Sequence, residues 1–159
     1  MLNSIAEAGK ILTSIVTTKI FYVTFAAWFF AQALKLIINL VLHHKLDFRL
    51  LVGTGGMPSS HTASVTALTT CVGLTVGFTD PVFMVALLYC VVVISDALGV
   101  RRAAGKQAKL LNMIVDELRH HKFHAEKRMK ELLGHTPIEA AAGILIGLLF
   151  PIFFYLKNG

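Results

Sequence analysis

Residues 62–98 read TASVTALTTCVGLTVGFTDPVFMVALLYCVVVISDAL, two apolar runs separated only by a short turn. As helices that rise 1.5 Å per residue, the runs 62–78 and 82–98 are each long enough to cross a thin bilayer core. The linking residues Thr79, Asp80 and Pro81 are typical of a tight turn. The stretch therefore predicts a hairpin of two transmembrane helices whose outer ends lie on the same side of the membrane.

Two further apolar segments flank this hairpin, from about Ile20 to Leu42 and from Ile138 to Leu156. The chain is 55% hydrophobic and 15% charged, with a mean hydropathy of +0.69, which is too apolar for an ordinary soluble domain. Its 159 residues leave room for one small domain, residues 1–159. We therefore expect an all-α integral membrane bundle with about four transmembrane helices.

The basic residues gather in the two segments that the hairpin places on one side, 43–61 and 99–137. They are Lys45, Arg49, Arg101, Arg102, Lys106, Lys109, Arg119, Lys122, Lys127, Arg128 and Lys130. Because positive loops stay in the cytoplasm, this side should be cytoplasmic in a bacterial cytoplasmic membrane, with both termini outside. Apolar residues at helical spacing within 99–134 predict two short amphipathic helices on the membrane surface. Their basic faces would meet anionic lipids, so no nucleic-acid partner is expected.

Two pairs of glycines are spaced four residues apart within the apolar segments. Gly73 and Gly77 form one pair, and Gly143 and Gly147 form the other. Glycines at this spacing let helix backbones approach closely. The pattern favours tight packing inside the bundle over a dimer seam, although a homo-oligomer is also compatible with it.

Histidines stand at the starts of two predicted helices. His61 follows a turn that contains Ser59 and Ser60, and His135 comes directly before Thr136. The first N–H groups of a helix have no intrahelical partner, and the helix dipole favours an anion there. Because arginines lie nearby on the same side, the two helix starts predict a phosphate site.

Each of these motifs also has a structural interpretation. Thr136 and Glu139 match a capping box that starts a helix, with Pro137 at its first position. Glu139 could instead accept an N–H from the imidazole of His135, and the two roles are compatible. Ser59 and Ser60 could cap a helix or bind phosphate oxygens, and His61 could protonate a leaving oxygen.

Lys35 and the pair Arg101 and Arg102 each allow two interpretations. Lys35 lies about two turns inside the first span, where a lysine is costly unless it snorkels to the surface or serves a polar site. Arg101 and Arg102 follow the third span and could be topology anchors or a guanidinium fork on a phosphate. His120 and His124 have the i, i+4 spacing of metal ligands, but no third ligand is evident in the sequence, so we expect no metal site and no cofactor.

Four motifs carry a resemblance to a known family: Ala31-Gln32 with Lys35, GGMPSSHTA at 55–63, SDALGVRRAAGKQA at 95–108 and KELLGHTPIEAAAGILIG at 130–147. Together they resemble the divergent branch of the type 2 phosphatidic acid phosphatase family. The resemblance implies a metal-independent membrane enzyme that hydrolyses a lipid phosphate or diphosphate. It implies attack by His135 to form a phosphohistidine, with Glu139 as the carboxylate partner and His61 as the acid, and it places Ser59 and Ser60 in the phosphate loop.

The sequence departs from the common motifs of that family at several positions. Ser60 replaces a glycine, Glu139 replaces an aspartate, and Met129 stands where an arginine usually precedes the nucleophile. The basic residues left to bind the phosphoryl oxygens are Arg101, Arg102, Lys35 and Arg49. Four spans are fewer than the usual six, so a second copy could complete the site. The alternative function is a non-catalytic membrane protein that binds or moves anionic lipids.

Overall fold

The structure, a computed structural model, describes residues 14–44, 56–120 and 136–158. Its helices are α2 (Lys19–His43), α3 (Ser60–Val76), α4 (Pro81–Leu98), α5 (Val100–His120) and α6 (Pro137–Asn158). The described residues contain no β-strand, and the predicted all-α fold is confirmed.

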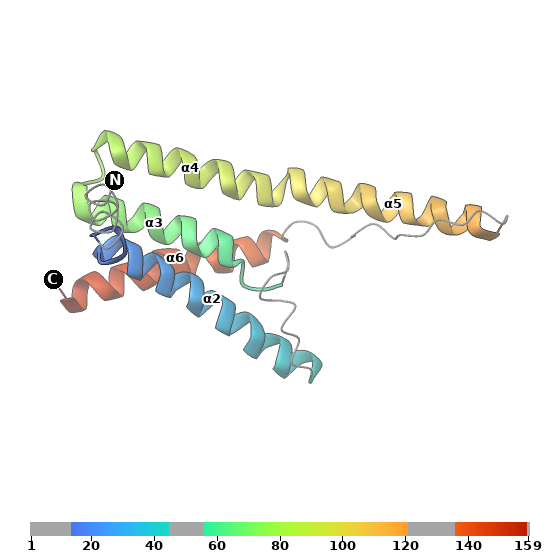
Figure 1. The fold of residues 1–159 in the computed structure, drawn as a ribbon, viewed down its shortest axis with the longest axis horizontal. Coiled ribbons are helices and arrows are strands. Elements are labelled where there is room, and N and C mark those ends of the chain that lie inside the picture. The colour runs from blue at the N-terminus through green and yellow to red at the C-terminus, as the bar shows by residue number, and fades with distance from the viewer. Residues whose placement is uncertain (1–13, 45–55, 121–135, 159) are drawn as a thin grey trace, which may run out of the picture.

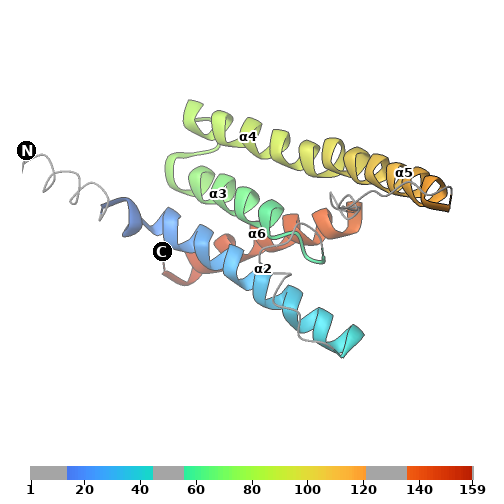
Figure 2. The same ribbon diagram turned by 45° about the vertical axis from the view of Figure 1, so that its right-hand side comes forward.

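Helix α3 lies at the centre of the bundle. It contacts α2, α4 and α6 and runs between them in Figure 1. Successive helices of the bundle run in opposite directions (Figures 1 and 2). Helices α3 and α6 therefore start at the end of the bundle where α2 and α4 finish. The turn between α3 and α4 lies at the opposite end of the bundle. The predicted hairpin is therefore confirmed, and His61 lies at the same end as the start of α6.

Within residues 14–44, 56–120 and 136–158, three stretches are long and apolar enough to cross a membrane: most of α2, the stretch that begins with α4, and most of α6. Helix α3 has 17 residues and is therefore about 26 Å long. It is shorter than the others and is covered by them on several sides. The predicted helical membrane bundle is confirmed with three candidate spans, and α3 is its short inner helix, whose crossing of the membrane stays a prediction.

The centre of the bundle contains threonines whose hydroxyl groups are hydrogen-bonded. Thr69 Oγ1 donates to the Val65 carbonyl at 2.9 Å and lies 3.1 Å from the Ala86 carbonyl of α4. Thr70 Oγ1 donates to the Thr66 carbonyl at 2.8 Å. Bonding to a carbonyl of the preceding turn removes the cost of burying a hydroxyl in an apolar bundle. This arrangement allows the threonine-rich α3 to occupy the interior.

Helix α6 approaches α3 most closely at its two glycines. A Cβ atom at Gly143 would lie 2.5 Å from the Ser59 carbonyl oxygen, and one at Gly147 would lie 2.5 Å from Thr66 Cβ. Both distances are far below van der Waals contact, so only glycine fits. The predicted tight packing inside the bundle is confirmed for this pair.

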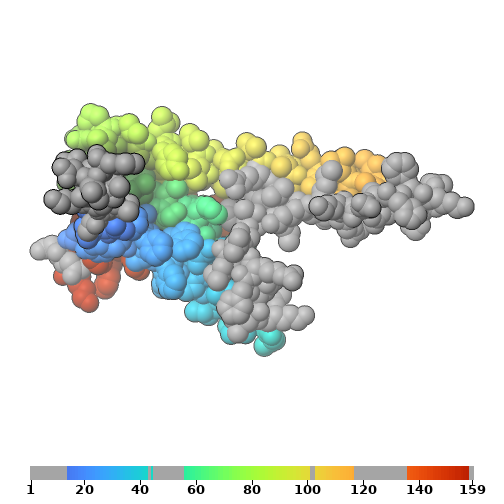
Figure 3. All heavy atoms as spheres, viewed as in Figure 1, coloured from blue at the N-terminus to red at the C-terminus, as the bar shows by residue number. Residues whose placement is uncertain are grey.

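Helix α5 continues in line with α4 and extends beyond the bundle (Figures 1 and 3). Gly99 joins the two helices by backbone bonds on both sides: the Gly99 N–H donates to the Ser95 carbonyl at 2.8 Å, and the Ala103 N–H donates to the Gly99 carbonyl at 2.9 Å. The first predicted amphipathic helix is confirmed as α5, and its placement on the membrane surface stays a prediction. The second predicted amphipathic helix lies outside the described residues.

Candidate functional site

The turn before α3 is bonded to the first turn of α6. The Ser59 N–H donates to the Glu139 carbonyl at 3.0 Å. One turn further along α6, Gly143 leaves the space that the Ser59 carbonyl occupies. The two helix starts that the sequence predicted to form one site therefore lie side by side.

Ser59 is the N-cap of α3 and is fully buried. Its Oγ accepts the Thr62 N–H at 3.3 Å and donates to Thr62 Oγ1 at 2.9 Å. Its N–H and its hydroxyl thus both bond within the protein, which makes Ser59 the residue that fixes the turn. Ser60 is also buried. Phosphate binding by either serine stays a prediction.

Lys35 of α2 is directed into the same region. Its side chain is only 3% exposed, which excludes the snorkelling interpretation for this structure. Its stem passes Gly56, where a Cβ atom would lie 3.2 Å from Lys35 Cδ. The Glu139 carboxylate attracts the Lys35 ammonium group electrostatically. A buried lysine with an acidic neighbour is typical of a polar site within a membrane protein.

Glu139 and Thr136 form the capping box that the sequence predicted. The Thr136 N–H donates to Glu139 Oε2 at 3.1 Å, and the Glu139 N–H donates to Thr136 Oγ1 at 3.3 Å. These bonds hold the carboxylate at the start of α6, near the turn and Lys35. A bond from Glu139 to the imidazole of His135 stays a prediction, because His135 lies outside the described residues.

His61 lies in the first turn of α3, and its side chain is exposed. At 100° per residue, His61 shares one stripe of the helix with Ser64 and Leu68. The stripe that faces Gly143 and Gly147 is a different one, on the far side of the helix. His61 is therefore at the predicted end of the bundle but faces away from α6.

The structure gives the helix position, but no side-chain contact, for two of the three predicted arginines. Arg101 and Arg102 lie in the first turn of α5, at the same end of the bundle as the starts of α3 and α6 (Figures 1 and 2). Arg49 lies outside the described residues. The structure thus brings together Lys35, Ser59, Ser60 and Glu139, leaves His61 at the edge of this group, and does not test the others.

The sequence analysis missed the contribution of Gly56. It treated this residue as part of a turn, and its positive φ of 87° fits that interpretation. The structure adds that Gly56 leaves room for the Lys35 stem. The depth of Lys35 in its span was the available signal, because a lysine buried there needs a polar segment packed against it.

A comparison with protein families gives a match over residues 16–150 to the model described as the Divergent PAP2 family. The chain belongs to this family. It is also 42% identical over 138 residues to the Uncharacterized membrane protein YuiD of Bacillus subtilis (strain 168), a match that covers 80% of this chain and 87% of that protein. No solved structure matches the chain. Membership in the Divergent PAP2 family confirms the resemblance, and together with the candidate spans the match identifies an integral membrane protein.

The contact between Gly56 and Lys35 can be tested with a matched pair of alanine variants. Gly56 and Gly77 both have positive φ, 87° and 101°, so the backbone strain from alanine should cost each about 1–3 kcal/mol of unfolding free energy. A Cβ atom at Gly77 meets nothing within 4 Å, whereas one at Gly56 presses on Lys35. Thermal unfolding in detergent should therefore show a larger loss for Gly56→Ala than for Gly77→Ala. Equal losses would mean that Lys35 does not depend on this glycine.

Proposed function

We propose that this member of the Divergent PAP2 family is a membrane phosphatase that hydrolyses a lipid phosphate or diphosphate without a metal ion. The observation that carries the proposal is the convergence of Lys35, the Ser59 turn and Glu139 at the start of α6. A buried cation beside a helix start is suited to a phosphoryl group, because the ammonium and the first N–H groups both favour negative charge. Family membership supports the same chemistry.

In the proposed reaction, His135 attacks phosphorus, a nitrogen–phosphorus bond forms, and the bond from phosphorus to the lipid oxygen breaks. His61 gives its proton to that oxygen, and Glu139 accepts an N–H from the attacking imidazole. Water then attacks the phosphohistidine while His61 takes a proton from it, which releases phosphate and restores both histidines. Lys35, Ser60, Arg101, Arg102 and Arg49 are the proposed ligands of the phosphoryl oxygens, with Ser59 holding the turn.

The proposed function is tested by incubating the purified protein with a panel of lipid phosphates and diphosphates. We expect release of phosphate from at least one of them, at the same rate with and without a chelator. Vanadate should inhibit, because it can adopt the five-coordinate geometry of phosphoryl transfer. If the protein binds anionic lipids but releases no phosphate from any of them, the alternative of a non-catalytic lipid-binding protein replaces the phosphatase.

The proposal places the site at the cytoplasmic side of the membrane. Met57 lies in the turn before α3 and Thr79 in the turn after it, and both side chains are exposed. After Cys71 and Cys90 are replaced by alanine, Met57→Cys should react only with reagents that enter the cell. Thr79→Cys should react with an impermeant reagent added outside. The reverse labelling would place the site at the external face.

A further inference from the structure

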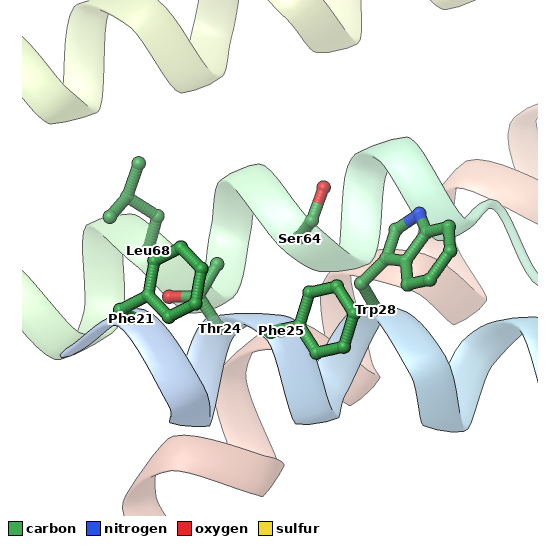
Figure 4. A pocket seen from close by; sticks show the side chains of 6 residues that line it. All are labelled: Phe21, Thr24, Phe25, Trp28, Ser64 and Leu68. Carbon is green, nitrogen blue, oxygen red and sulfur yellow. The ribbon is translucent and has the colours of Figure 1, made fainter. Parts of the chain in front are cut away.

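An apolar groove runs between α2 and α3, and Figure 4 shows the side chains that line it. Its volume is about 430 Å³. It is lined by Phe21, Thr24, Phe25, Trp28, Ser64 and Leu68. Nearly all of the lining atoms are apolar, so the groove suits a hydrocarbon.

The groove is aligned with residues of the candidate site on both helices. On α3, Ser64 and Leu68 follow His61 by three and seven residues and share its stripe. On α2, Trp28 precedes Lys35 by seven residues, or two helical turns, and lies on the same stripe. In Figure 4, Trp28 and Ser64 lie toward the end of α3 where His61 is found, and Phe21 and Leu68 lie deeper. The groove therefore leads from the polar end of the bundle into the membrane.

The groove has room for one chain. Its volume of about 430 Å³ lies within the range of small-molecule pockets. Ser64 does not make the wall polar, because its hydroxyl donates to the His61 carbonyl at 2.9 Å. Leu68 lies about 10 Å along α3 from His61, so a chain that starts at the site would run past both residues.

We propose that this groove holds one fatty acyl chain of the lipid phosphate, while the phosphate group lies at the start of α3 beside Lys35 and His61. The inference rests on the proposed function and adds that Trp28, Ser64 and Leu68 select the chain. One face of α3 would then contact both parts of the lipid: His61 lies at the leaving oxygen, and Ser64 and Leu68 lie along the acyl chain.

Trp28 reports on the groove directly, because it is the only tryptophan in the chain. The protein is placed in phosphatidylcholine vesicles, and two probes with the same brominated acyl chains are added at equal, small mole fractions. One is a non-hydrolysable phosphonate analogue of phosphatidic acid, and the other is phosphatidylcholine. Bromine quenches tryptophan fluorescence on close contact. We expect the phosphonate to quench Trp28 at least twofold more strongly, and an excess of the unbrominated phosphonate to abolish the difference.

Variants that fill the groove should remove this preference. Ser64→Leu places a larger side chain in the wall, and Leu68→Phe does so independently, should either variant fold poorly. Val85→Leu is the matched control, because Val85 is 70% exposed on α4 and does not line the groove. Each groove variant should reduce quenching by the phosphonate to the level of phosphatidylcholine, whereas the control should keep the twofold preference.

Equal quenching of the native protein by the two probes would overturn the inference, since the groove would then contact only bulk lipid. An unchanged preference in both groove variants would also overturn it. The phosphatase assay separates this result from the proposed function. If the protein releases phosphate but the two probes quench equally, only the groove assignment is wrong. If the phosphonate quenches more strongly but no phosphate is released, the groove assignment is supported and the catalytic proposal is wrong.

Discussion

Replacement of His135 by alanine should lower phosphate release from a lipid phosphate by ~10³-fold or more, because the attacking nitrogen is lost. His61→Ala should lower it by ~10²–10⁴-fold, because the leaving oxygen is then expelled without a proton. Both variants should fold normally. His61 is exposed, and the N–H groups at the start of α6 are satisfied by Thr136 and Glu139 without it.

A substrate with a better leaving group distinguishes the two histidines. The nitrophenolate released from p-nitrophenyl phosphate needs no proton, so this ester should restore the first step, seen as a burst of nitrophenol, in His61→Ala but not in His135→Ala. The labelled phosphoenzyme should likewise form in His61→Ala and be absent from His135→Ala. Normal turnover by a folded His135→Ala protein would contradict the mechanism. Equal rescue of both variants would contradict the assignment of separate roles.

Replacement of Gly143 by valine should destabilise the bundle by at least about 3 kcal/mol. The added Cβ would meet the Ser59 carbonyl at 2.5 Å, and the backbone cannot yield as a flexible side chain can. Ala141→Val is the matched control, because Ala141 is exposed on the same helix two residues earlier. Thermal unfolding in detergent should show a large loss for the first variant and almost none for the second.

The same substitution should also disturb the candidate site. Moving α6 away from α3 lengthens the bond between the Ser59 N–H and the Glu139 carbonyl, which holds the turn. Any Gly143→Val protein that survives should therefore lose activity as well as stability. A Gly143→Val protein as stable as Ala141→Val would show that α6 does not pack on α3 through this glycine.

The helix ends were the most predictable part of the fold, because local residues determine them. The fourth span, predicted from Ile138 to Leu156, is α6, Pro137–Asn158, and its capping box is formed as expected. Asp80 caps α4 by accepting the Val82 N–H at 2.8 Å, which fits the predicted turn. Each of these features depends on residues within four positions of one another.

Two features could not be predicted, because they depend on how distant segments pack. The sequence presented Lys35 as an anomaly with two explanations, and only the approach of Gly56 from another segment decides between them. The side of α3 that His61 occupies likewise became clear only when α6 was placed on the other side.

The central position of α3 has a consequence for the order in which the chain is assembled. Of the four bundle helices, α3 is the least hydrophobic, and its buried threonines face neighbours instead of lipid. Its closest neighbour among the bundle helices, α6, leaves the ribosome after α2, α3 and α4. During synthesis, α3 must therefore enter the membrane with one flank uncovered, and it gains its final partner only when the two glycines of α6 arrive. Chains that stop before Gly143 would expose that flank and should be the preferred substrates of membrane quality-control proteases.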